Sequence, residues 1–364
     1  MTKNKLIYIL ITMLGLINQI KAQPTFIWGK QFGTEHEDAG QDIVICENGD
    51  FVLTGSTTGN LYSNNTGKRD GFIVKFDSLG NEIWKEQFGS VEDDKPWEIE
   101  KDKLGNIYIA GTTNGIINGK GHGNQDVLIR KYNSNGDLIV TKIIGTDSLD
   151  YLSEIYTDNE LNIYVVGNTK GKLGQNRYGD WDYFIMKLDS NFTELYTYQF
   201  GTEQWDYCND FVLGKEGDFY IGGFTFGNLG ESNKGETDAF IAHYSKNGEL
   251  LKLKQFGTAQ HENIRNLIID KTGNIYISGT SHGNIVNVNI GKSDVFLMKL
   301  NKEWNITWEK QFGTKSWDEV WKMDFIYEES KILISGCHNP DAYVRSYDNH
   351  GNLVWNQVFT AKGN

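Results

Sequence analysis

The chain has 364 residues, of which 38% are hydrophobic and 13% aromatic, with 41 glycines and only three prolines. This composition is too apolar for a disordered protein and is rich in residues that favour turns. The formal net charge is −13, from 48 acidic and 35 basic residues. Phosphate binding depends on clustered Lys and Arg, so we expect no nucleic acid among the partners of this acidic chain.

The first predicted element is a targeting segment, residues 1–22. Lys3 and Lys5 precede a short apolar run that ends at Ala22, which is the order of features in a secretory signal peptide. The run is too short to span a bilayer, and no later segment is long and apolar enough to do so. We therefore expect a secreted or periplasmic protein without a membrane span, with one folded domain over residues 23–364. Loss of the three lysines of the leader takes the net charge to −16.

A 56-residue repeat organises the rest of the chain. The stretch WGKQFGTEHED, residues 28–38, returns as WKEQFGSVEDD, YTYQFGTEQWD, KLKQFGTAQHE and WEKQFGTKSWD, and KIIGT is a degenerate copy. Successive markers of the repeat are 56 residues apart, at Gln31, Gln87, Ile143, Gln199, Gln255 and Gln311. Units of constant length indicate six copies of one supersecondary element, not six domains.

Each unit contains four short runs in which apolar residues alternate with polar ones. In the first unit these are DIVI, FVLTG, GFIVKFD and EIWKEQF, separated by turns at ENGD and SLGN and by a long polar loop. Such runs, bounded by Asn, Gly and Asp turns, predict antiparallel strands. Four-stranded units repeated around an axis predict an all-β fold, a β-propeller with six four-stranded blades. A β-solenoid is the alternative, but its coils are much shorter than 56 residues.

The best-preserved residues of the repeat recur at fixed places: Trp84, Gln87 and Gly89, then Gly105, Asn106, Tyr108, Gly111 and Thr112, then Asp126, Ile129 and Lys131. This pattern resembles the bacterial SBBP β-propeller repeat family over residues 28–359. The resemblance implies an extracytoplasmic propeller, and it supplies no reaction and no catalytic residues. The family name implies seven blades, which is the weaker alternative because this chain has six sets of middle strands. The WxxQF strand occurs a seventh time, so we expect one terminal copy to complete a blade with strands from the other end of the chain.

Several residues recur in every unit, and we expect them to have a structural role and not to form a ligand site. A glycine ends the second run of every unit, which indicates a bulge or a close backbone approach: Gly55, Gly111, Gly167, Gly223, Gly279 and Gly336. An acid follows each marker by seven residues: Asp38, Asp94, Asp150, Asp206, Glu262 and Asp318. A second acid precedes each third run: Asp70, Asp126, Asp182, Asp238, Asp294 and Asp341. Six-fold repetition favours carboxylates that accept backbone N–H groups, so we expect no metal and no cofactor, with calcium as the alternative.

A ligand site is expected on one face of the propeller. Strand direction alternates, so the long loop and the connection that carries GTEHED leave the sheet at the same end, and binding residues concentrate on long loops. Residues there that break the repeat are the informative ones. Five tryptophans are candidate ligand contacts: Trp97, Trp181, Trp205, Trp317 and Trp321. Their rings suit the apolar faces of sugars, although large aromatic side chains also pack between blades.

Few residues on this face offer catalytic chemistry. His36 or His261 could act as a base, Tyr151 or Tyr207 as an acid, and Arg265 could hold an anionic group, as in elimination from a uronic-acid polysaccharide. No catalytic motif supports these residues. We therefore favour a monomeric, non-catalytic binding or scaffold module whose partner is a glycan or a surface protein. The alternative is a polysaccharide lyase or hydrolase with its site on the same face.

Overall fold

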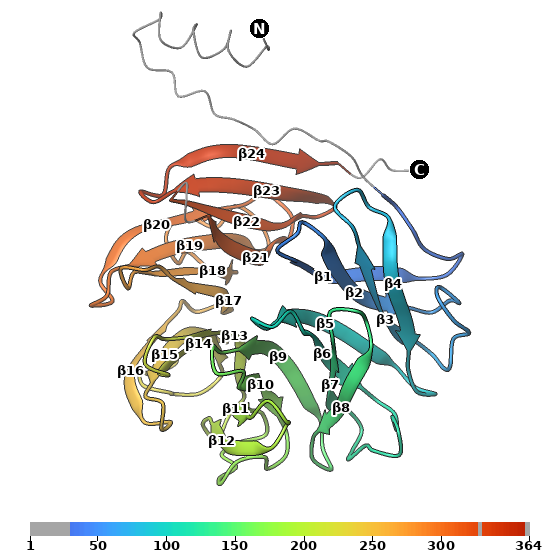
Figure 1. Cartoon of the computed structure of the whole chain (residues 1–364). Coiled ribbons are helices and arrows are strands. Elements are labelled where there is room, and N and C mark those ends of the chain that lie inside the picture. Colours follow the sequence, from blue (N-terminus) through green and yellow to red (C-terminus); the bar gives the residue numbers. More distant parts are fainter. Residues whose placement is uncertain (1–29, 327–329, 361–364) are drawn as a thin grey trace, which may run out of the picture.

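The computed structural model describes residues 30–326 and 330–360, so the predicted signal peptide lies outside the described residues. The described chain forms six four-stranded sheets, each made of four consecutive strands. Figure 1 shows the sheets arranged around a central axis, with the first strand of each sheet innermost and the fourth outermost. The predicted all-β propeller with six blades is confirmed, and the blades are numbered 1 to 6 in chain order.

All pairings within a blade are antiparallel. The first strands are β1 (Asp38–Ile45), β5 (Asp94–Lys101), β9 (Asp150–Thr157), β13 (Asp206–Leu213), β17 (Glu262–Ile269) and β21 (Asp318–Ile326). The second strands are β2 (Phe51–Thr57), β6 (Ile107–Thr113), β10 (Ile163–Thr169), β14 (Phe219–Thr225), β18 (Ile275–Ser281) and β22 (Lys331–His338). The third strands are β3 (Asp70–Phe76), β7 (Asp126–Tyr132), β11 (Asp182–Leu188), β15 (Asp238–Tyr244), β19 (Asp294–Leu300) and β23 (Asp341–Asp348). The fourth strands are β4 (Glu82–Phe88), β8 (Leu138–Ile144), β12 (Glu194–Phe200), β16 (Leu250–Phe256), β20 (Ile306–Phe312) and β24 (Leu353–Phe359).

The glycine near the end of each second strand faces a β-bulge in the first strand. In blade 1, Gly55 pairs with Gly40 and the preceding Thr54 pairs with Asp42, so Gln41 is the extra, bulged residue. The same irregularity occurs at the equivalent place in the other five blades. A Cβ atom on Gly55 would lie 2.1 Å from the carbonyl oxygen of Ala39. The close backbone approach predicted from the repeated glycines is therefore confirmed.

The hydrophobic core lies between neighbouring blades. Val52 and Ile73 of blade 1, for example, pack with Ile99 of blade 2. The residue equivalent to Ile99 is at most 7% exposed in blades 2 to 6, whereas Ile43, which occupies this place in blade 1, is 52% exposed. The junction between blades 6 and 1 therefore buries less apolar surface at this position than the other junctions do.

The prediction that one blade combines strands from both ends of the chain is wrong. β24 pairs with β23 inside its own blade, and the described part of the N-terminal copy, residues 30–37, contains no strand. Trp28, where that copy begins, lies outside the described residues. The described chain enters the ring at a first strand and leaves it at a fourth, so every sheet is completed by local hairpins. Local pairing closes short loops and costs less chain entropy than a strand from the far end would.

The two long connections of each blade do lie on the same face, as predicted. In four blades the end of the long loop pairs with the connection that leads into the next blade, as between Arg69 and Asp93. We call this side the loop face. The opposite side carries the tight turns between first and second strands and between third and fourth strands, and we call it the hairpin face.

Candidate functional site

The six bulges of the first strands surround the centre of the propeller. A bulge leaves one residue unpaired and redirects its side chain, and bulges are frequent beside binding sites. The residue at the bulge differs from blade to blade, although the glycine opposite it in the second strand repeats. We call these six residues the bulge ring: Gln41, Trp97, Ser153, Asn209, Arg265 and Trp321.

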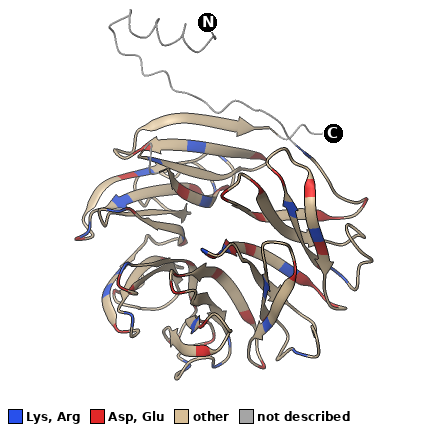
Figure 2. Cartoon of the chain, in the orientation of Figure 1, with Lys and Arg blue, Asp and Glu red and all other residues tan. Residues whose placement is uncertain are grey.

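The residue that follows each bulge forms a second ring, and most of its members are charged. These channel residues are Asp42, Glu98, Glu154, Asp210, Asn266 and Lys322. Lys322 Nζ lies 3.5 Å from Glu98 Oε2 and 3.9 Å from Glu154 Oε2. These three side chains come from blades 6, 2 and 3, so they meet across the centre of the propeller. Figure 2 shows both charge signs on the inner strands around this centre.

The other channel residues also join neighbouring blades. Asp42, Asp210 and Asn266 each accept a hydrogen bond from a backbone N–H in the first strand of the next blade, at 3.1, 2.6 and 3.1 Å. This leaves the Nδ2 atom of Asn266 buried and without a hydrogen-bond partner among the described residues. A buried donor that is left unpaired costs free energy unless a ligand or water satisfies it.

Burial changes the protonation of the channel carboxyl groups. It raises the pKa of Glu98 to about 7, against the opposing effect of Lys322, and the pKa of Asp210 to about 6. The pKa of Glu154 is also raised well above its usual range, first by burial and then by the charge of Glu98. Burial acts to lower the pKa of Lys322, but the carboxylates of Glu154, Glu98 and Asp210 outweigh it and raise that pKa. Lys322 therefore stays charged at neutral pH, while part of the carboxyl population is protonated.

A cavity of about 420 Å³ opens beside these residues at the end of the first strands that is nearest the loop face. We call it the channel-mouth cavity. It is lined by Glu98, Glu154, Asp210, Asn266 and Lys322, and also by Ser153 and Asn209 of the bulge ring. It also brings together five of the ten residues that the sequence singled out: Tyr151, Trp181, Tyr207, Arg265 and Trp321.

The aromatic residues of this cavity divide into packed and free groups. The ring of Trp181 lies 5.4 Å from that of Tyr151 and 5.3 Å from that of Tyr207, and Trp181 is only 5% exposed. It is a wedge between neighbouring aromatic side chains. Burial raises the pKa of Tyr207, so its hydroxyl keeps its proton at neutral pH and can donate a hydrogen bond. Trp321, at 55% exposed, and Arg265, also exposed, are free to contact a ligand.

The other five predicted site residues do not line this cavity. The imidazole of His261 contacts the carboxyl group of Glu236, and its ring lies 5.2 Å from that of His282, which contacts Trp317 at 5.3 Å. His36 is exposed in a turn of the loop face. Trp97 packs against the core between blades 2 and 3, and Trp205 packs edge-on against Phe226. The residues considered for catalysis are therefore split between separate places.

The repeated acids are tied to backbone in every blade. The first series accepts hydrogen bonds from the backbone N–H of the residue four positions earlier, as Asp150 does from Thr146 at 2.6 Å. In blades 1 to 5 the second series does the same, as Asp182 does from Tyr178 at 2.7 Å. In four of these blades the acid also accepts a hydrogen bond from the side-chain amide of the marker glutamine, as Asp182 does from Gln199 at 2.7 Å. These contacts hold the connections of the loop face in place. No group of three or more His, Cys, Asp or Glu side chains that could hold a metal occurs within residues 30–326 and 330–360.

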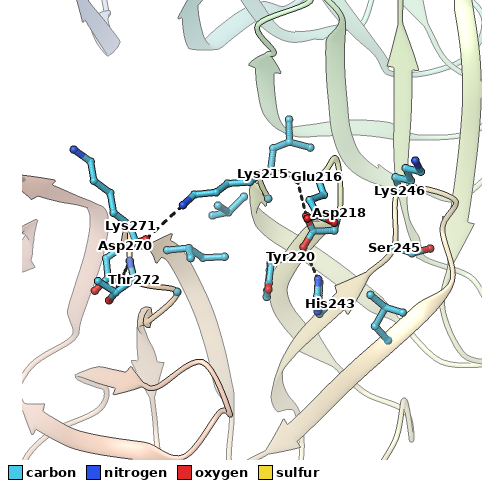
Figure 3. Close-up of a pocket in the computed structure, with 16 residues that line it drawn as sticks. Lys215, Glu216, Asp218, Tyr220, His243, Ser245, Lys246, Asp270, Lys271 and Thr272 are labelled. Carbon is cyan, nitrogen blue, oxygen red and sulfur yellow. Dashed lines mark hydrogen bonds and ion pairs between the residues drawn. The ribbon is translucent and has the colours of Figure 1, made fainter.

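A cavity with a volume of about 850 Å³, larger than the channel-mouth cavity, lies on the hairpin face between the turns of blades 4 and 5. Figure 3 shows His243 hydrogen-bonded to Asp218, at 2.7 Å, with Tyr220 beside it. The Tyr220 and His243 rings are stacked with centroids 4.0 Å apart. His243 takes the place of a lysine that stands in four other units, and a similar groove of about 770 Å³ lies between the turns of blades 3 and 4. We therefore interpret this groove as a product of the repeat.

Sequence reasoning missed the channel residues. It identified Trp97, Arg265 and Trp321, but not the position that follows them. Aligning the six units would have shown two successive polar or charged residues, such as Asn209 and Asp210, inside a strand that should alternate. Such a break in the alternation of polar and apolar residues indicates a β-bulge.

Comparisons with known proteins agree with this fold. The model of the SBBP β-propeller repeat matches residues 83–118 and 253–285. Two solved structures superpose on most of the chain at 10% identity. The periplasmic gluconolactonase PpgL of Pseudomonas aeruginosa gives a TM-score of 0.54, covering 87% of this chain and 84% of that one. The Dos1 propeller gives 0.52, covering 88% and 70%. At this identity the likeness shows the fold alone.

One relative of known name is the regulatory protein FlaEY of Caulobacter vibrioides. It is 24% identical over 191 residues, which are 46% of this chain and 20% of that protein. The match therefore spans only a fifth of FlaEY. Within the part of the chain that the structure describes, no helix is long and apolar enough to cross a membrane.

Proposed function

We propose that the protein is a secreted binding module that holds a glycan at the channel-mouth cavity. The observation that carries this proposal is the exposed ring of Trp321 beside a cavity with polar walls. A free aromatic ring can stack on the apolar face of a pyranose, while Arg265, Asn209 and the channel carboxyl groups offer hydrogen bonds to hydroxyl groups. A cavity of about 420 Å³ has the volume of a small-molecule site, enough for one or two sugar units.

The test is a panel of purified polysaccharides titrated calorimetrically against the wild-type protein, Trp321→Ala and Trp317→Ala. Trp317 is the matched control, because it is 41% exposed and lies four residues away, outside the cavity. We expect Trp321→Ala to weaken binding at least about tenfold, as removal of a central aromatic contact commonly does, and Trp317→Ala to change it less than about twofold. If no polysaccharide binds, or if both variants lose affinity equally, the proposal is wrong and a surface protein becomes the better candidate partner.

A polysaccharide hydrolase or lyase is the second candidate function, and one observation favours it. A carboxyl group such as Glu98, with its pKa raised to about 7, is partly protonated at neutral pH and can donate a proton to a leaving oxygen. The same panel decides this point when new reducing ends and unsaturated products are measured beside binding. Products that appear with the wild-type protein and disappear with Glu98→Gln would show catalysis.

Export is part of the proposal. It is supported by the charged and apolar pattern of residues 1–22, which lie outside the described residues. Fractionation of cells that produce the full chain, with N-terminal sequencing of the mature protein, tests it. We expect a mature protein outside the cytoplasm that begins near Gln23, whereas an uncleaved cytoplasmic chain would contradict export.

A further inference from the structure

The channel residues beside the proposed glycan site include more carboxyl groups than cations. Asp42, Glu98, Glu154 and Asp210 face Lys322, and Arg265 is the only other cation that lines the cavity within the described residues. The ammonium group of Lys322 lies within 4 Å of the carboxylates of both Glu98 and Glu154. The chain thus already places one primary ammonium group against these carboxylates. That group is a compact cation with three hydrogen-bond donors.

A second observation points to a ligand at the same place. Asn266 lines the cavity and is only 4% exposed, yet its Nδ2 atom has no hydrogen-bond partner among the described residues. Its Oδ1 atom is already used, because it accepts a hydrogen bond from the backbone N–H of Met323. A ligand oxygen, such as a sugar hydroxyl, would satisfy the free donor.

We propose that the glycan held at the channel mouth carries free amino groups, and that the channel carboxylates receive one of them as an ammonium ion. This inference rests on the proposed function and adds the chemical class of the sugar. A neutral sugar would leave the carboxylates without a further counter-charge, and a uronic acid would place a like charge against them. An amino sugar also brings a cation to the face of Trp321, where the π electrons attract it.

The pH dependence of binding follows from the same groups. An ammonium ligand favours ionised carboxylates, so it must displace protons from the carboxyl groups whose pKa burial has raised. Affinity should therefore rise from pH 5 toward neutral pH, with release of protons from the carboxyl groups, and fall again at higher pH as the sugar amine loses its own proton. The groups that face the ligand from the surrounding strands are Asp42, Glu98, Glu154, Asp210 and Lys322, with Arg265, Tyr151 and Tyr207 at the mouth and the buried Cys208 behind them.

The experiment compares two oligosaccharides that differ only in the amino group: a tetramer of glucosamine and a tetramer of N-acetylglucosamine. Each is titrated calorimetrically at pH 6.5, where the sugar amines are largely protonated, against the wild-type protein, Glu98→Gln, Glu154→Gln and Glu160→Gln. Glu160 is an exposed acid on the hairpin face, so its variant controls for non-specific attraction between an acidic protein and a polycation. Titration in two buffers of different ionisation enthalpy measures the protons released.

We expect the glucosamine tetramer to bind at least tenfold more tightly than the acetylated one. We also expect this preference to fall at least threefold in Glu98→Gln and Glu154→Gln and to persist in Glu160→Gln. Equal or tighter binding of the acetylated tetramer would overturn the inference and leave the proposed function standing. Binding of some other polysaccharide, with no binding of glucosamine, would do the same. If no glycan binds at all, the proposed function fails, and this inference fails with it.

Discussion

Glu98 of blade 2 and Lys322 of blade 6 are 224 residues apart in the sequence, yet Lys322 Nζ lies 3.5 Å from Glu98 Oε2. The contact exists because the first strands of all six blades face one axis. It puts charged side chains from distant units into a shared, partly buried space. Their pKa values, and the ligand that we propose for them, follow from that arrangement.

Replacing Glu98 with Gln should stabilise the protein at high pH. The pKa of Glu98 rises from 4.5 in the unfolded chain to about 7 in the folded protein, so the folded state binds its proton more tightly. The stabilising contribution of this group is fully present below pH 4.5 and is lost as pH rises through 7. We expect Glu98→Gln to be more stable than wild type by about 1 to 3 kcal/mol at pH 8 and equal to it at pH 4.5. Urea unfolding at both pH values measures the difference, and a destabilised variant at pH 8 would contradict the raised pKa.

Replacing Lys322 with Met should have the opposite effect at high pH. The variant leaves Glu98 and Glu154 without their common cation, so their ionised forms are disfavoured. We expect the melting temperature to fall by a few degrees at pH 8 and by less at pH 5, where the carboxyl groups carry protons. Lys302→Met is the control, because Lys302 is a surface residue with a side chain that is 73% exposed. Equal losses at the two pH values would show that Lys322 acts through packing and not through charge.

The junctions between blades should differ in how much they tolerate a cavity. Ile99 is 7% exposed between blades 1 and 2, whereas Ile43, its equivalent in blade 1, is 52% exposed. We expect Ile99→Ala to cost about 2 to 4 kcal/mol of unfolding free energy and Ile43→Ala less than about 1 kcal/mol. Chemical denaturation of the two variants gives these values. Equal costs would mean that Ile43 is buried against another part of the chain in solution.

The bulges should depend on the glycines opposite them. A Cβ atom on Gly223 would lie 1.8 Å from the carbonyl oxygen of Tyr207, so Gly223→Ala must move the bulge that presents Asn209 and Asp210. We expect a loss of at least about 2 kcal/mol in unfolding free energy, together with weaker ligand binding. In the control Gly40→Ala, the new Cβ atom meets Leu53 at an ordinary distance of 3.7 Å. A Gly223→Ala variant with the unfolding free energy and the ligand affinity of the wild type would contradict the role given to the bulge.

The repeat made most of the fold predictable. Six copies of one unit gave the strands, the turns and the face that carries the long loops, since each weak local signal was seen six times. The repeated glycine at Gly55 also predicted a close backbone approach. Closure of the ring was not predictable, because it depends on where the chain enters and leaves the repeat in space, and β24 pairs within its own blade.

The candidate site was predicted only in part. Trp321 and Arg265 stood out because they break the repeat, and they do line the cavity. The channel residues did not stand out, because a charged residue on a strand that reads as alternating looks like a solvated position. Only ring curvature brings Glu98, Glu154 and Lys322 together, and that curvature is a property of all six blades. His261 and Trp317 also break the repeat, but both contact His282, at a separate place on the loop face.

The most direct test of the channel-mouth site is a crystal structure of the mature protein with the polysaccharide fragment that binds most tightly. We expect sugar density against Trp321 and Arg265, with a ligand polar atom within hydrogen-bond distance of Asn266 Nδ2. Density in the hairpin-face groove beside His243, with the channel mouth holding water only, would contradict a ligand site at the centre of the propeller.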